Sequence, residues 1–128
     1  MNVLEFRFAF YARDFDKSVD FYRNILGMKY VGGWDRDDGK GALLSAGGTA
    51  VVEIYGAVDG KTYEGPSPTA LNLALRLENV AAVDSFFERL ADQGWERSEE
   101  PQNRPWGHRS FIVHDPDGIP IHIYCELT

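Results

Sequence analysis

Glu53 and His122 are the two side chains of this chain best suited to acid–base chemistry or to metal binding, and each stands alone in an apolar run. A carboxylate or an imidazole in such surroundings is a candidate general base or metal ligand. Arg7 lies in a similar run near the N-terminus. It has no lone pair to offer a metal, but it could stabilise an enolate-like negative charge.

Strand alternation predicts where these side chains point. Phe6, Phe8 and Phe10 lie on one face of a strand and Arg7 on the other, because successive side chains of a strand point to opposite faces. Leu71, Leu73 and Leu75 form the matching face in the second module, and both bulky faces should meet the helices. The opposite face is then the floor of a ligand cavity, which we expect to contain Arg7, Glu53, Tyr55, Asn72, His122 and Tyr124.

A repeat organises the chain. The pattern of residues 6–10, Asp14 and Phe21-Tyr22 returns 65 positions later as residues 71–75, Asn79 and Phe86-Phe87. Each copy is too small to bury much apolar surface by itself, so two similar modules should pack together around a cleft. We therefore expect one domain, residues 1–128, with module one at 1–56, a connecting loop at 57–69 and module two at 70–128.

Capping residues, side-chain alternation and turn residues predict where the helices and strands lie. Asp14 can cap a helix over 15–26, and a second helix should run from Asn79 to about Gln93. Strands are expected at 4–11, 28–34, 42–46, 49–55, 70–77, near Trp95, at 109–114 and at 119–124. The sequence Asp115-Pro116-Asp117-Gly118 is typical of a tight turn. The segment 56–69 has little periodicity and could act as a mobile lid.

The order strand, helix, three strands, written twice, resembles the vicinal oxygen chelate superfamily, which includes glyoxalase I, extradiol dioxygenases and bleomycin-resistance proteins. Residues 13–27 and the turn at 115–118 carry the resemblance. It implies an α+β fold of two tandem βαβββ modules that form a cleft. It does not decide the function, because this scaffold hosts isomerases, oxygenases and non-enzymatic binders.

In metal-dependent members, four inward positions supply His or Glu ligands, and here the resemblance places Arg7, Glu53, Asn72 and His122 at them. A lone Glu and His make a poor metal site, since transition-metal sites generally need three protein ligands. We expect no cofactor, and instead an ion pair between Arg7 and Glu53. If a divalent metal does bind, Glu53 and His122 are its candidate ligands.

Aromatic residues suggest a ligand with rings. Tyr11, Trp34, Tyr55, Trp106 and Tyr124 could line a flat apolar cleft, although ordinary core packing is the alternative for Trp34. Trp106 lies in a Pro-Trp-Gly segment that resembles the bleomycin-resistance branch, where aromatic residues border the binding groove. His108 and His114 flank turns, and we expect both to be exposed to solvent.

Composition and charge limit the classes of partner and the cellular location to be expected. The net charge of -7 disfavours nucleic acid and favours neutral or cationic small molecules. No apolar run approaches the roughly 18 residues of a membrane span. Cys125 is the single cysteine, so no internal disulfide forms and a cytoplasmic location is expected. The sheet edges and apolar rims of paired modules favour a homodimer.

Three functions remain open on these residues. The first is metal-free binding of a small aromatic or cationic molecule, as in bleomycin-resistance proteins. The second is a metal-dependent glyoxalase-type lyase or isomerase, or a dioxygenase, that uses Glu53 and His122 and recruits His108 or His114. The third is metal-free acid–base catalysis by Glu53 or His122, with Arg7 stabilising an enolate-like charge. Positions 7 and 72 favour the binding protein, because neither residue is a good metal ligand.

Overall fold

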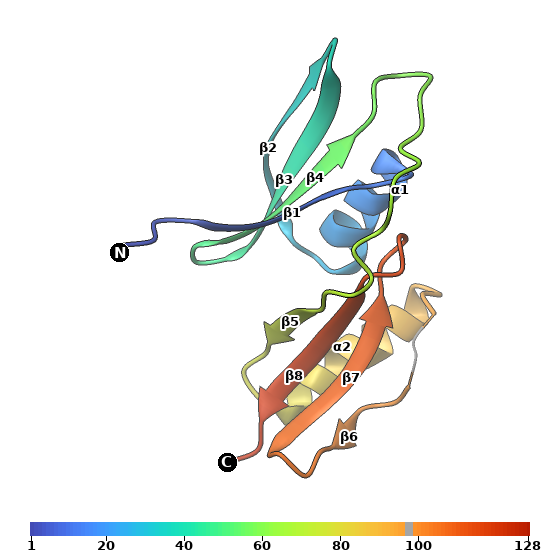
Figure 1. Ribbon diagram of the computed structural model, residues 1–128. Helices are drawn as coiled ribbons and strands as arrows, with labels where there is room; N and C mark the ends of the chain where they lie inside the picture. The colour runs from blue at the N-terminus through green and yellow to red at the C-terminus, as the bar shows by residue number, and fades with distance from the viewer. Residues whose placement is uncertain (97–98) are drawn as a thin grey trace. The chain divides into compact units, whose positions relative to one another are not determined.

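A computed structural model, which describes residues 1–96 and 99–128, divides the chain into two units, residues 1–68 and residues 69–128 (Figure 1). Each unit contains a helical segment and a four-stranded mixed sheet in its described residues. The fold is therefore of the α+β class, with the two βαβββ modules that the repeat predicted.

The first unit follows the predicted order of elements. Its sheet has the order β1-β4-β3-β2, in which β1 and β4 are parallel and the other neighbours are antiparallel. The elements are β1 (Phe6–Tyr11), α1 (Phe15–Asp20), the π-helical turn η1 (Phe21–Ile25), β2 (Lys29–Arg36), β3 (Gly39–Gly47) and β4 (Ala50–Gly56).

The first helix begins where its capping residue predicts. The Asp14 side chain accepts a hydrogen bond from the Lys17 amide at 3.1 Å, which satisfies one of the free N–H groups at the helix start. The second half of the predicted helix is wider than an α-helix, because the Leu26 amide donates to the Phe21 carbonyl, five residues back, at 2.8 Å. Phe21 and Tyr22 are both fully buried there.

The second unit has the strand order β5-β8-β7-β6, again with its first strand parallel to its last. The Asn79 side chain caps the helix by accepting a hydrogen bond from the Ala82 amide at 2.9 Å. The elements are β5 (Leu73–Arg76), α2 (Val80–Asp92), β6 (Gln102–Asn103), β7 (His108–His114) and β8 (Pro120–Glu126).

Two strand predictions in this unit are wrong. The strand expected over 70–77 covers only Leu73–Arg76, since just these residues pair with β8, and Asn72 therefore precedes the strand. Trp95 is in no strand because its amide donates to the Leu90 carbonyl at 3.0 Å and closes the end of α2. Among the described residues, the short strand between α2 and β7 is Gln102–Asn103 instead.

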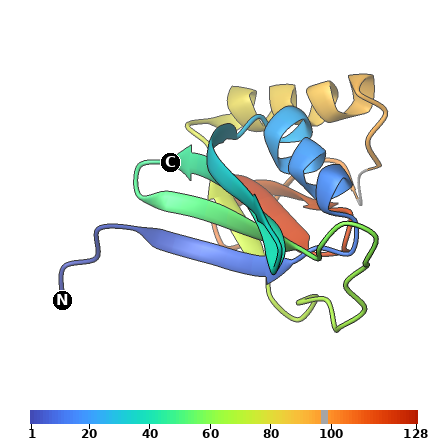
Figure 2. The same ribbon diagram turned by 90° about the horizontal axis from the view of Figure 1, so that it is seen from above.

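Each helix covers one face of the sheet in its own unit (Figure 2). Phe10, Leu44 and Ile54 are buried in the first sheet, and Phe10 contacts Tyr22 of η1 with ring centroids 5.8 Å apart. In the second unit Phe87 of α2 packs edge-on against Phe111 of β7 at 5.4 Å. The alternation predicted for the strands is thus realised, and it sends the other set of side chains to the face opposite each helix.

The prediction fails at the strand starts. Phe6 and Leu71 were expected to pack beneath the helices, but both are exposed. Phe6 is the first residue of β1 and Leu71 precedes β5, so the two lie at or before the start of a strand. No helix among the described residues is long and apolar enough to span a membrane.

Candidate functional site

The face of the first sheet opposite α1 presents the polar and aromatic residues that the sequence analysis singled out in this module. The parallel register of β1 and β4 places Ala9 beside Glu53 and Tyr11 beside Tyr55. Their neighbours Val52 and Ile54 are buried on the helix side. Two strands with a period of two therefore carry this set of side chains on one surface.

Arg7 and Glu53 form the ion pair predicted from the sequence. The distance from Arg7 Nη1 to Glu53 Oε1 is 3.3 Å. The Glu53 side chain is 12% exposed and that of Arg7 is 40% exposed, so the pair is half-buried rather than enclosed. Arg7 Nε also donates to the Glu5 carboxylate. The hydrogen bond to Glu5, followed by the one to Glu53, raises the pKa of Arg7 above its usual value.

Tyr55 contacts Glu53 from another side. Burial raises the pKa of Tyr55 above its ordinary value, and the negative charge and hydrogen bonding of Glu53 raise it further. The Tyr55 hydroxyl therefore stays protonated at neutral pH and can donate to the Glu53 carboxylate. Arg7 and Tyr55 thus both interact with the Glu53 carboxylate.

Three aromatic rings form a row across this face. The Tyr55 ring centroid lies 5.0 Å from that of Tyr11 and 6.1 Å from that of Trp34. Strand register explains the row, since Tyr55 pairs with Gly41 and Gly41 pairs with Trp34. The Trp34 ring covers Gly41, where a Cβ atom would collide with it. The absence of a side chain at position 41 thus leaves room for the Trp34 ring beside Tyr55, with the two ring planes 57° apart.

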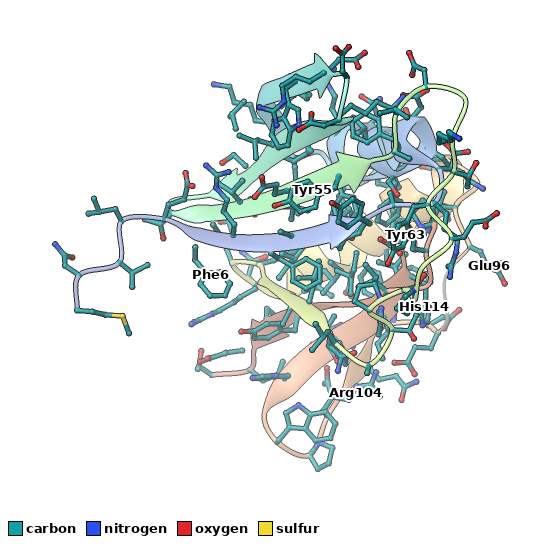
Figure 3. All side chains as sticks on the ribbon, turned by 45° about the horizontal axis from the view of Figure 1, so that its top comes forward. Phe6, Tyr55, Tyr63, Glu96, Arg104 and His114 are labelled. Carbon is teal, nitrogen blue, oxygen red and sulfur yellow. The ribbon has the colours of Figure 1, made fainter. Side chains whose placement is uncertain are left out.

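A fourth ring was not expected. Tyr63, in the segment between β4 and β5, stacks on Tyr11 with centroids 5.0 Å apart and planes 19° apart. Figure 3 shows Tyr55 on β4 and Tyr63 on this segment, near the C-terminal end of β1. The segment has no helix or strand, so no periodicity could have predicted the contact.

In the second unit, His122 and Tyr124 lie on the face of β8 opposite the buried Ile121 and Ile123, and both are half-buried. The expectation that His108 is exposed is wrong. Its ring stacks on Tyr124 at 4.5 Å, because the two residues are diagonal neighbours on adjacent antiparallel strands.

Asn72 and His114 complete the candidates from this unit. Asn72 was expected on the cavity floor, but it is exposed ahead of β5 and so lies outside the alternation of that strand. His114 is exposed at the end of β7, as expected. The His114 carbonyl accepts a hydrogen bond from Trp95 Nε1 at 3.2 Å.

Trp106 lies at the tip of the turn between β6 and β7 and is 66% exposed. Arg104 fastens the base of this turn. Its amide donates to the His108 carbonyl at 2.6 Å, its Nε donates to Ser110 Oγ at 2.9 Å, and its guanidinium pairs with Glu99. The turn therefore presents a large aromatic ring to solvent from a well-braced position.

The donor set does not fit a metal ion. Arg7 has no lone pair, and Glu53 already interacts with Arg7 and Tyr55. Within residues 1–96 and 99–128, no group of three or more His, Cys, Asp and Glu side chains is arranged to hold a metal.

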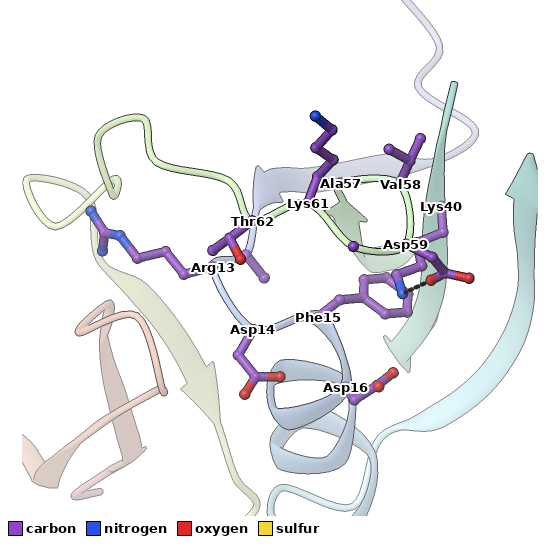
Figure 4. A pocket seen from close by; sticks show the side chains of 12 residues that line it. Arg13, Asp14, Phe15, Asp16, Lys40, Ala57, Val58, Asp59, Lys61 and Thr62 are labelled. Atoms are coloured by element: carbon purple, nitrogen blue, oxygen red, sulfur yellow. Dashed lines mark hydrogen bonds and ion pairs between the residues drawn. The ribbon is translucent and has the colours of Figure 1, made fainter. Parts of the chain in front are cut away.

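A hollow of about 470 Å³ lies elsewhere in the first unit, at the start of α1 (Figure 4). Lys40 bridges one side of it, with Nζ 3.0 Å from Asp59 Oδ1 and 5.3 Å from the centre of the Phe15 ring. The hydrogen bond to Asp59 raises the pKa of Lys40, which keeps it cationic. The sequence analysis did not predict this hollow.

Comparison with known proteins places the chain in a family. It is 29% identical over 136 residues to the uncharacterized protein YraH of Bacillus subtilis, covering 99% of this chain and 100% of that one. Its fold is similar to that of TnmS3, an antibiotic binding protein from Streptomyces sp. CB03234 (TM-score 0.75, 23% identity, 98% and 97% of the two chains). It is also similar to that of a lactoylglutathione lyase from Agrobacterium tumefaciens (TM-score 0.71, 18% identity, 93% and 90%).

These two structural neighbours carry different functions, so their likeness establishes only the fold. The family model for the Glyoxalase/Bleomycin resistance protein/Dioxygenase superfamily matches residues 6–123, which is most of the chain. The protein belongs to this superfamily, the vicinal oxygen chelate proteins.

Proposed function

We propose that this protein binds a small planar aromatic molecule, without a metal ion and without chemical turnover. The proposed site is the aromatic face, which we define as Tyr11, Trp34 and Tyr55 together with the Arg7–Glu53 pair beside them. The observation that carries the proposal is the placement of the Trp34 ring over Gly41, with its centroid 6.1 Å from the centroid of the Tyr55 ring. A surface built from several aromatic rings suits a ligand that itself carries rings.

The charges beside the rings favour a neutral or cationic ligand. Arg7 lies between two carboxylates, Glu5 and Glu53, so the three groups together carry one negative charge. The chain as a whole carries a net charge of -7, which should speed the approach of cations at low salt. The description of TnmS3 as an antibiotic binding protein is in line with a binding role.

A planar dye tests the aromatic face. We expect proflavine, a planar three-ring cation, to bind more tightly than the planar anion 2-anthracenecarboxylate, as measured by titration calorimetry. Tyr55→Ala should weaken proflavine binding about tenfold, because an aromatic contact of about 1.4 kcal/mol is lost.

Tyr30→Ala is the matched control for this experiment. Tyr30 is an exposed tyrosine on β2 that pairs with Leu44, a residue buried on the helix side of the same sheet. Its removal should leave the affinity for proflavine unchanged. If Tyr55→Ala and Trp34→Ala both bind proflavine as the parent does, the aromatic face is not the site.

Metal content separates this function from a metal-dependent lyase, isomerase or dioxygenase. We expect the purified and dialysed protein to hold less than about 0.1 equivalent of Zn, Ni, Mn or Fe by elemental analysis, since Arg7 and Asn72 stand at ligand positions of the family. One equivalent that is retained by the parent, and lost from the Glu53→Ala and His122→Ala double variant, would refute the proposal. It would favour the metal-dependent alternative.

A further inference from the structure

Residues 57–68, which we call the strap, connect the two units and contain no helix or strand. Three attachments hold the strap to the rest of the first unit. Lys40 of β3 pairs with Asp59 at 3.0 Å, Arg13 donates to the Gly65 carbonyl at 3.1 Å and to Ser67 Oγ, and Tyr63 stacks on Tyr11. The strap is therefore an irregular segment that side-chain contacts fasten to the rest of the first unit.

The strap wraps around the ring of Tyr63. The Tyr63 hydroxyl donates to the Pro66 carbonyl at 3.0 Å, and Gly65 lies so close to the ring that a Cβ atom there would collide with it. Arg13 holds the next residues along, through Gly65 and Ser67. Contacts within the strap thus orient the Tyr63 ring. The stack of this ring on Tyr11 then connects the strap to the aromatic face.

Tyr63 extends the aromatic face by one ring. Trp34, Tyr55 and Tyr11 come from strands, and Tyr63 follows them at the edge strand β1. Centroids 5.0 Å apart leave no room for a third ring between Tyr11 and Tyr63, so a ligand must lie against the row rather than inside it. The ring carried by the irregular strap is the member of the row best able to move away.

We propose that the strap is a latch on the aromatic face, closed by the stack of Tyr63 on Tyr11. This inference rests on the function proposed above. A planar ligand that lies across Tyr55 and Tyr11 also contacts Tyr63 when the latch is closed, so it binds the closed state more tightly. By linkage, the ligand holds the latch closed and the closed latch strengthens ligand binding. Tyr63 is then a positioning residue, which holds the half-exposed Tyr11 ring in place and forms the last ring of the row.

Trypsin measures latch opening directly, because Lys61 is exposed within the strap. Cleavage after Lys61, followed by mass spectrometry under native conditions, should be about fivefold faster in Tyr63→Ala than in the parent. Saturating proflavine should slow this cleavage severalfold in the parent and leave it unchanged in Tyr63→Ala. Each rate is divided by the rate at which trypsin cleaves a small peptide in the same mixture, because the cationic dye can itself occupy the Lys/Arg pocket of trypsin. The same variant should bind proflavine about fivefold more weakly.

Tyr63→Phe is the matched control, since it keeps the ring and removes only the hydrogen bond to Pro66. It should restore the parent's cleavage rate and affinity if stacking closes the latch. Equal cleavage of the parent and Tyr63→Ala without proflavine would overturn the inference, as would a parent that proflavine does not protect.

The two proposals fail separately. If Tyr55→Ala weakens proflavine binding while Tyr63→Ala changes neither affinity nor cleavage, the latch is wrong and the proposed function stands. If Tyr55→Ala and Trp34→Ala have no effect on proflavine binding, the aromatic face is not the ligand site. The latch proposal is then refuted as well, because it assumes that site.

Discussion

Replacement of Asp115 by alanine should lower the free energy of unfolding by about 2 to 4 kcal/mol. The Asp115 side chain joins β7 to β8, and the residue is only 4% exposed. Its Oδ1 accepts hydrogen bonds from the amides of Asp117 and Ile119, both at 2.8 Å. Alanine leaves these two donors without their acceptor in a buried turn, and each such loss costs about 1 to 3 kcal/mol.

Urea unfolding can measure this loss in the second unit. Trp95 is a suitable reporter, because its indole donates to the carbonyl of His114, the residue before Asp115. Asp115→Asn is the matched control, since an amide oxygen keeps the acceptor, and it should be clearly more stable than Asp115→Ala. An Asp115→Ala variant within about 0.5 kcal/mol of the parent would mean that water or relaxation satisfies both amides.

Replacement of Trp34 by alanine should weaken proflavine binding by about 1 to 3 kcal/mol, or roughly 5-fold to 150-fold. The Trp34 ring lies over Gly41 on the aromatic face, so little conformational freedom remains to be lost when a ligand covers the ring. An indole that becomes buried removes a large apolar area from water, which is why tryptophan so often dominates binding.

Calorimetric titration of Trp34→Ala and of Trp95→Phe separates this contribution from a general effect. Trp95 is half-buried at the end of α2, and its replacement should leave the affinity unchanged. Trp106→Ala, Tyr124→Ala and Asn72→Ala test separately the ligand-binding residues that the sequence analysis predicted in the second unit. Full affinity in Trp34→Ala would contradict the prediction.

Local patterns in the sequence determined the modules and the faces of their strands. Val52 and Ile54 are apolar while Glu53 and Tyr55 are polar or amphipathic, and a strand must send these two sets to opposite sides. The caps of both helices are equally local, because Asp14 and Asn79 bond to amides three residues away. The ion pair between Arg7 and Glu53 followed from the same alternation in two strands.

The contacts between distant aromatic rings were decided by strand register and by the path of the connecting segment. Trp34 reaches Tyr55 only because the hairpin of β2 and β3 places Gly41 between them, and His108 stacks on Tyr124 only through the register of β7 and β8. Tyr63 meets Tyr11 across 52 positions of sequence, through a strap without periodicity. Period and propensity act between near neighbours, so they cannot specify which distant rings meet. That choice is made when the strands pair and the connecting segment packs against them.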